Sequence, residues 1–311
     1  GFDDWLQDFE AAKRLAAEER KNILILFDGS DWCGPSIRMA ENVFYQQRFL
    51  DGIQMGYVPV FIDFPRGEAA RTRIQDLERN ARLYAQFGEP GFPTVAITDS
   101  DGLPYGWAGY ADGVDGFLRQ LDTARQIRDK RDSLFMDVSL SQGAAKATKA
   151  MEAFALLEEQ NVLPFYLGRF GDWFVEARET DPDNQQGQLE VYFEIMWVAQ
   201  LSDTVRISPL GLGQVVGQLT KWDSEFDFRD HDRAARLYWR AALLSKDTPP
   251  VMRSFAAEGM KYQPKDTELA EALKYLHDIA GQLNIVGVGS GFAVAAGGLI
   301  LTNSHVVESI D

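Results

Sequence analysis

The chain of 311 residues is long enough for two or three domains. Its 47 acidic and 31 basic side chains give a net charge of −16, which repels nucleic acid and anionic membranes and argues against either as a partner. A single cysteine excludes a disulfide within the chain, and no apolar run approaches the roughly 20 residues of a membrane span.

The first part of the chain predicts a helix followed by two buried strands. Apolar residues recur at helical spacing over residues 5–16, and Asp3 or Asp4 can cap that helix. Residues 22–27 and 57–64 are short, continuous apolar runs, which are typical of strands covered on both faces. These segments predict the beginning of an α/β domain.

The remaining elements of the first region alternate between helices and strands. They are a helix at about 34–44, a charged helix over 68–88, a strand over 92–98, a turn at 99–102, a return strand over 103–110 and a helix over 114–128. A right-handed crossover makes the first two strands parallel, and the hairpin adds an antiparallel pair. We therefore expect a small mixed sheet with helices on both faces over residues 1–130.

Strand-like runs disappear between residues 131 and 283. Helical patterns alternate there with short breakers such as SPLGLG at 208–213, and they predict roughly six or seven antiparallel helices. The pattern over residues 234–273 resembles tetratricopeptide-type hairpins, although a clean period of about 34 residues is missing. We expect a separate all-α domain.

The stretch DGSDWCGPSIRM at residues 28–39 carries the chemistry of the first domain. Cys33 lies in the loop after a buried strand and at the start of a helix, where unpaired N–H groups and the helix dipole favour a thiolate. A thiolate is the nucleophile of disulfide exchange. Pro35 suits the first helical turn, and Ser36 stands where a second cysteine would complete a C-x-x-C pair.

In this setting WCGPS resembles the W-C-G-P-C site of the thioredoxin family. The predicted element order is similar to the thioredoxin fold over about residues 1–125, and GFPT at residues 91–94 lies where that family keeps a cis-proline beside the active cysteine. The segments ILFDGSDWC and VPVFIDFPR are also similar to bacterial thioredoxin-like proteins of the cell envelope. The resemblance implies a periplasmic, envelope or secreted location.

The resemblance also implies roles for single residues. Cys33 would be the attacking cysteine with Trp32 beside it, and Pro93 would be the cis-proline. The backbone of Phe92 and Thr94 would be offered to an extended substrate. The implied partners are protein clients, held through a mixed disulfide at Cys33.

Two departures from the family pattern concern the second half of an exchange reaction. Ser36 replaces the resolving cysteine, and its hydroxyl can donate to the thiolate or cap the helix. Phe27 lies six positions before Cys33, where thioredoxins keep a buried acid, and we expect neighbouring Asp28 to face elsewhere. With one thiol, a mixed disulfide must be resolved by an external thiol or by the client's own second cysteine.

Two hypotheses follow for the function. In the first, Cys33 performs single-thiol exchange or traps clients covalently. In the second, the cysteine is a relic, and the thioredoxin-like and helical regions form a non-enzymatic recognition or regulatory part of a larger protein. Neither hypothesis requires a metal or another cofactor.

Residues 284–311 differ in composition from the helical region, because they are rich in glycine and β-branched residues. The segments GSGFAV and GGLILTNSHVV resemble the first strands of trypsin-like serine proteases of the high-temperature-requirement type, and His305 matches the catalytic histidine of that family. A catalytic triad needs an acid and a nucleophile as well, and neither follows His305 in this chain. We expect the chain, which opens on Gly1 without a signal peptide, to be the front part of a longer protein with a protease domain.

His231 lies between Asp230 and Asp232, which makes a metal site conceivable. Acidic residues at a helix start are also expected for capping and for their interaction with the helix dipole. Capping is the simpler interpretation, so we expect no metal there.

Overall fold

The computed structural model describes residues 2–88, 91–207, 221, 228–246, 248–282, 291–293 and 300–302. The chain forms two compact units, of which one holds Gly1–Trp173 with Ser202–Ser208 and the other holds Phe174–Leu201 with Pro209–Asp311. Within the described ranges, no helix is both long enough and apolar enough to cross a membrane.

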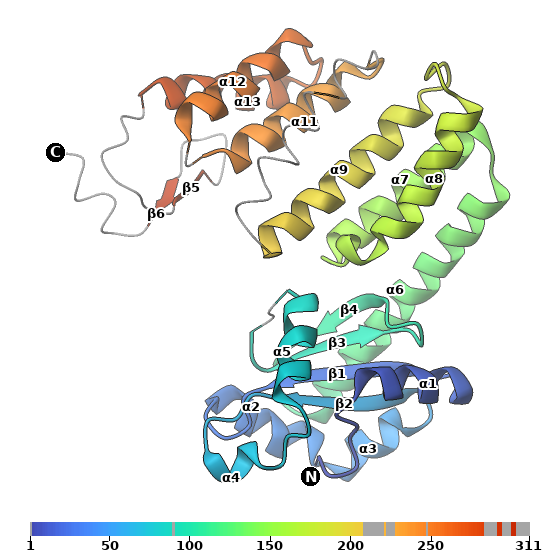
Figure 1. The fold of residues 1–311 in the computed structure, drawn as a ribbon, viewed down its shortest axis with the longest axis vertical. Helices are drawn as coiled ribbons and strands as arrows, with labels where there is room; N and C mark the ends of the chain where they lie inside the picture. Colours follow the sequence, from blue (N-terminus) through green and yellow to red (C-terminus); the bar gives the residue numbers. More distant parts are fainter. Residues whose placement is uncertain are drawn as a thin grey trace. The chain divides into compact units, whose positions relative to one another are not determined.

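The first unit contains a four-stranded mixed sheet, shown in Figure 1. Its strands, in spatial order, are β2 (Tyr57–Asp63), β1 (Asn22–Asp28), β3 (Thr94–Thr98) and β4 (Pro104–Ala108). β1 runs parallel to β2 and antiparallel to β3, and β4 continues antiparallel to β3. The mixed α/β sheet predicted from the sequence is confirmed.

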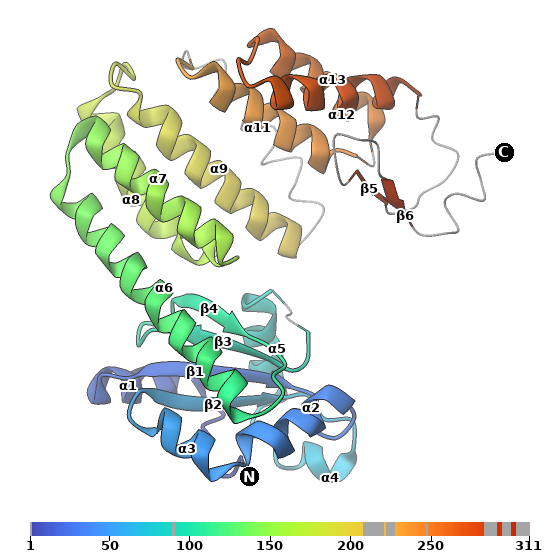
Figure 2. The same cartoon turned by 180° about the vertical axis from the view of Figure 1, so that it is seen from behind.

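Helices cover both faces of this sheet (Figure 1, Figure 2). One face packs against α1 (Phe9–Glu19) and α5 (Leu77–Gln86). The other face packs against η1 (Ala40–Phe44), α3 (Gln47–Gln54), α6 (Val114–Leu140) and the end of α2 (Gly34–Met39).

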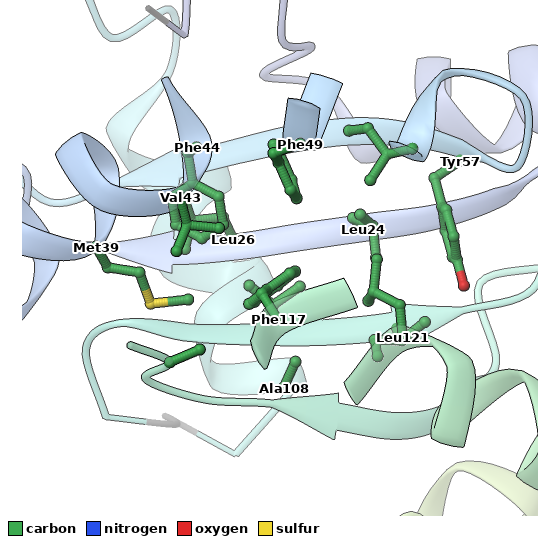
Figure 3. Packing of buried hydrophobic residues seen from close by; sticks show 14 of the residues in the cluster. Leu24, Leu26, Met39, Val43, Phe44, Phe49, Tyr57, Ala108, Phe117 and Leu121 are labelled. Atoms are coloured by element: carbon green, nitrogen blue, oxygen red, sulfur yellow. The ribbon is translucent and has the colours of Figure 1, made fainter. Parts of the chain in front are cut away.

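Alternation along β1 sends successive side chains into two separate cores. Ile23, Ile25 and Phe27 enter the core beneath α1 and α5. Leu24 and Leu26 enter the opposite core, which Figure 3 shows with aromatic side chains from η1, α3 and α6. Side chains on both faces of β1 are buried, so its sequence is a continuous apolar run and does not alternate between apolar and polar residues.

The first helix begins later than predicted. Asp8 is its N-cap residue and accepts a hydrogen bond of 3.0 Å from the Ala11 amide, whereas Asp3 and Asp4 cap nothing. Trp5 is buried in the turn before the helix, and Leu6 forms a parallel bridge with Val60. The apolar spacing before Asp8 therefore reflects core contacts of a non-helical segment.

The charged helix predicted over residues 68–88 is wrong as a single element, because it is divided into α4 (Glu68–Arg71) and α5. Asp76 starts the second helix by accepting a hydrogen bond of 2.9 Å from the Arg79 amide. The predicted strand at 92–98 begins two residues later, at Thr94. An Asx cap and a proline thus set boundaries that apolar periodicity alone does not show.

Helix α6 extends well past its predicted end and crosses residue 130 without a break. The helical elements that follow are α7 (Gly143–Glu159), η2 (Leu163–Tyr166), α8 (Leu167–Thr180), α9 (Gln188–Ile207), α11 (His231–Leu244), α12 (Pro249–Lys261) and α13 (Thr267–Gln282). Apolar residues of α11, α12 and α13 share one core. The large helical region is confirmed, whereas the domain boundaries 1–130, 131–283 and 284–311 stay predictions.

A buried polar group, which we name the latch cluster, joins α6 to the sheet. It consists of Arg131, Asp99 and Tyr166, and Arg131 is only 5% exposed. The Arg131 guanidinium donates to Asp99 Oδ2 at 3.0 Å and to the Tyr166 hydroxyl at 2.7 Å. Tyr166 donates in turn to the Pro104 carbonyl at 2.8 Å, and burial raises its pKa to about 12. Residues beyond position 130 are therefore bonded to the four-stranded sheet.

Candidate functional site

Cys33 is the N-cap residue of α2, at the end of the loop that leaves β1. Its amide donates to the Gly29 carbonyl at 2.9 Å, and its carbonyl accepts from the Ile37 amide at 3.0 Å. The thiol does not cap the helix; Sγ lies 3.5 Å from the Phe92 carbonyl oxygen, in hydrogen-bond geometry. The side chain is half-buried. The backbone therefore fixes the cysteine, whose side chain is neither fully buried nor fully exposed.

The segment that faces the thiol comes from the start of β3. The Phe92–Pro93 peptide bond is cis, Pro93 is buried, and Thr94 pairs with Phe27 of β1 in the antiparallel ladder. The fold thus brings Cys33 together with a segment 59 residues later in the chain. The structure places Cys33 and residues 92–94 of the sequence-predicted site side by side.

Trp32 lies on the surface beside Cys33 and is 36% exposed. Its indole Nε1 donates to the Phe64 carbonyl at 2.8 Å, and its ring meets the Phe92 ring edge-on with centroids 5.8 Å apart. A side chain at Gly29 would collide with the indole, because a Cβ there would lie 2.7 Å from the ring. The indole is therefore held flat against the loop while part of it stays exposed to solvent.

Two carboxylates fix the loop before Cys33 to the end of β2. Asp31 accepts from the amides of Arg66 and Gly67 at 2.9 and 2.6 Å, and these bonds hold its pKa below the ordinary value. Asp63 accepts from the Ser30 hydroxyl at 2.6 Å and from the Ser30 amide at 3.0 Å. The loop is thereby ordered before any client arrives, which reduces the entropic cost of binding.

Beneath Cys33 lies a second buried polar group, which we name the thiol-side cluster and which consists of Asp28, Ser36 and Asp63. Asp28 and Ser36 are each 1% exposed. Burial raises the pKa of Asp28 to about 6, with a smaller rise from neighbouring Asp63, and the Ser36 hydroxyl opposes the rise. No hydrogen bond of ordinary geometry reaches Asp28 Oδ1 or Ser36 Oγ. Two polar atoms without a hydrogen bond of ordinary geometry are thus buried at the first turn of α2, the helix whose N-cap residue is Cys33.

The expectations for Asp28 and Ser36 are both corrected by these contacts. Asp28 does not face away: it follows Leu24 and Leu26 on the alternation of β1 and lies near Ser36. Counting every second residue back from Asp28 would have placed it on that face. The Ser36 hydroxyl neither reaches the thiol nor caps the helix, because it is turned into the protein.

Sequence reasoning missed Asp63 and Arg66. Asp63 lies opposite Asp28 in the parallel register of β1 and β2, a relation that appears only when the strands are paired. The Arg66 guanidinium lies over the Trp32 ring, with its carbon 3.9 Å from the ring centroid. A cation over an indole so close to a candidate nucleophile has no local sequence signal.

The other predicted sites lie elsewhere. His305 is outside the described residues, as is most of 284–311, where only β5 (Gly291–Ala293) and β6 (Ile300–Thr302) are described, as an antiparallel pair. At His231, Asp230 caps α11 by accepting from the Arg233 amide, and Asp232 accepts from the Lys265 amide. In the part of the chain that the structure describes, no three metal-binding side chains gather.

Comparison with known proteins agrees with the fold. The family model described as "Thioredoxin-like" matches residues 4–100. A Chlamydia pneumoniae protein named "Disulfide bond reductase DsbH" is 25% identical over 123 residues, which cover 39% of this chain and 73% of that protein. "Thioredoxin-related protein DsbJ" from the same organism is 23% identical over 94 residues, which cover 30% of this chain but 26% of that protein.

A solved structure titled "DsbH Oxidoreductase" is also similar, with 24% identity and a TM-score of 0.34 over 38% of this chain and 82% of that one. The family match and the sequence relatives show that the chain contains a thioredoxin-like domain with Dsb-type relatives.

Proposed function

We propose that the thioredoxin-like domain performs single-thiol disulfide exchange on protein clients in the cell envelope. The observation that carries the proposal is the position of Cys33 Sγ, 3.5 Å from the Phe92 carbonyl and next to the partly exposed Trp32 ring. A sulfur at an accessible helix start, facing an extended backbone segment, is arranged to attack a disulfide in a chain that lies along that segment.

The reaction is an exchange of one sulfur–sulfur bond for another. The Cys33 thiolate attacks one sulfur of the client disulfide, a bond forms between the two sulfurs, and the client's other sulfur leaves as a thiolate. The backbone of Phe92 and Thr94 aligns the client strand, and Pro93 between them has no N–H of its own.

Resolution needs a second sulfur that this chain does not contain. Ser36 occupies that position and is buried, and Cys33 is the only cysteine. The mixed disulfide is therefore released by an external thiol, or by the client's own second cysteine, which rearranges the client's disulfides. The domain acts as an isomerase or as a carrier of trapped clients rather than as an independent reductase.

A second candidate function is non-enzymatic recognition. The missing resolving thiol favours it, because the site cannot complete a reductive cycle alone. In that case the domain and the helices after it select proteins for a trypsin-like protease domain, to which residues 284–311 would belong. The Cys33 thiol would then be dispensable for client binding.

Intact-mass measurement separates the two functions. The folded protein is mixed with a peptide that contains one disulfide, and glutathione is then added. Exchange predicts a peptide adduct at Cys33 that glutathione removes, no adduct in Cys33→Ser, and spontaneous peptide release with an internal disulfide in Ser36→Cys. Peptide binding that persists in Cys33→Ser, with no adduct in the wild type, supports recognition instead.

A further inference from the structure

Two arginine side chains flank the proposed nucleophile and are free of ion pairs among the described residues. Arg66 and Arg38 are both exposed, and neither lies within salt-bridge distance of a described carboxylate. Arg66 lies over the ring of Trp32 and Arg38 lies beside Gly34, the two residues that border Cys33 in the chain.

The position of Arg66 is fixed by its own backbone. Its amide donates to Asp31 at 2.9 Å, and its guanidinium lies 3.9 Å from the centroid of the Trp32 ring. A guanidinium stacked on an indole keeps its N–H groups free at the ring edge, where they can meet a carboxylate. Asp31 attracts this cation, and its two carboxylate oxygens also accept hydrogen bonds from the amides of Arg66 and Gly67.

Arg38 follows the cysteine in the chain and belongs to α2. It lies one helical turn after Gly34 in α2, and its guanidinium folds back along the helix. A Cβ built on Gly34 would lie 3.5 Å from Arg38 Nη1. Gly34 directly follows Cys33, so the Arg38 cation lies close to the backbone next to the thiol.

We propose that Arg38 and Arg66 select disulfides that carry a carboxylate next to the attacked sulfur. The inference rests on the proposed function, because it concerns the client of the same thiol. Acidic residues beside the client's cysteine would supply the carboxylates, and so would a small anionic thiol compound. The sulfur chemistry is unchanged: a bond forms between Cys33 Sγ and the nearer sulfur, and the other sulfur leaves with the electron pair.

Two aromatic disulfides of different charge test the proposal. Cys33 in the full chain is reacted with the dianionic 5,5′-dithiobis(2-nitrobenzoate) and with neutral 4,4′-dithiodipyridine, and the ratio of rate constants is compared with that of free cysteine. We expect Arg66→Gln and Arg38→Gln each to lower the normalised ratio about threefold, and the double variant about tenfold. Added salt should reduce the preference of the wild type in the same way.

Arg14→Gln is the matched control, because it removes one exposed positive charge from α1, away from α2 (Figure 1). It should leave the ratio unchanged. Equal ratios in the wild type, the double variant and the control would overturn the charge preference. A Cys33 that fails to react with the neutral compound would instead overturn the proposed exchange function, so the two failures are distinguishable.

Disulfide-bonded peptides identify the source of the carboxylate. One peptide carries glutamate on both sides of its cysteine, a second carries glutamine there, and oxidised glutathione serves as the small anionic compound. A glutamate peptide that reacts faster than the glutamine peptide, with the difference lost in the double variant, assigns the preference to acidic clients. A preference for oxidised glutathione alone assigns it to a small thiol, and no preference overturns the proposal.

Discussion

The first unit contains two polar clusters that differ in how completely their polar atoms are hydrogen-bonded. In the latch cluster, the charge of Arg131 is matched by Asp99, and the Tyr166 hydroxyl both accepts and donates a hydrogen bond. In the thiol-side cluster, two carboxyl groups lie side by side, and no hydrogen bond of ordinary geometry reaches Asp28 Oδ1 or Ser36 Oγ. The residues of both clusters are buried, except that Asp99 is partly exposed.

The latch cluster therefore stabilises the fold, whereas the thiol-side cluster lowers its stability. Buried polar atoms in folded proteins are almost always paired, and exceptions concentrate at functional positions. The paired cluster attaches α6 and η2 to the sheet, whereas the unpaired one lies beneath Cys33. The substitutions below test this distinction, in order of expected effect.

Arg131→Met should have the largest effect on stability. The change leaves Tyr166 buried and Asp99 partly buried without their cation, and removal of one partner of a buried pair costs up to about 3–5 kcal/mol. Urea unfolding measures the loss, and Arg119→Met, an exposed position of the same helix, is the control. A loss within about 1 kcal/mol of the control would mean that the latch cluster contributes little to stability.

Asp28→Asn should change the free energy of unfolding, relative to the wild type, by an amount that depends on pH. Burial raises the folded-state pKa of Asp28 from 3.8 to about 6, so the protonated group favours folding below the unfolded pKa and this advantage is lost as pH rises through about 6. Asparagine does not titrate. From pH 3.5 to 7.5, the variant should therefore gain about 3 kcal/mol in free energy of unfolding relative to the wild type.

Urea unfolding at several pH values measures this gain, and Asp31→Asn provides the opposite case. The pKa of Asp31 is lowered by the amides it accepts from, so its contribution is present above the unfolded pKa and is lost as pH falls. The two variants should show pH dependences of opposite sign. A flat difference for Asp28→Asn would show that its carboxyl has an ordinary pKa in the folded protein.

Two serines beside the buried carboxyls should respond differently to truncation. Ser30→Ala removes a hydrogen bond to Asp63 and should cost about 1.5–3 kcal/mol. Ser36→Ala removes a hydroxyl that interacts with Asp28 without a hydrogen bond of ordinary geometry, so it should change stability by less than about 1 kcal/mol. Thermal unfolding of both variants measures the contrast, which equal losses would contradict.

The parts of this architecture that the sequence predicts are those with a continuous local pattern. The apolar runs of β1 and β2 predict buried strands, and WCGPS predicts a cysteine at a helix start. The thiol-side cluster depends instead on the pairing register that sets Asp28 opposite Asp63. The latch cluster joins residues more than 30 positions apart, and single-residue caps decide where α1 and α5 begin.

The reactivity of Cys33 tests the central claim most directly. The rate constant with neutral 4,4′-dithiodipyridine at pH 7 is measured for the folded chain and for the chain unfolded in urea, each divided by the value for free cysteine in the same solvent. A thiol stabilised for exchange predicts a folded-state ratio at least about tenfold higher than the unfolded one. An equal or lower ratio would contradict the account. The domain would then keep the thioredoxin-like fold without disulfide exchange at Cys33.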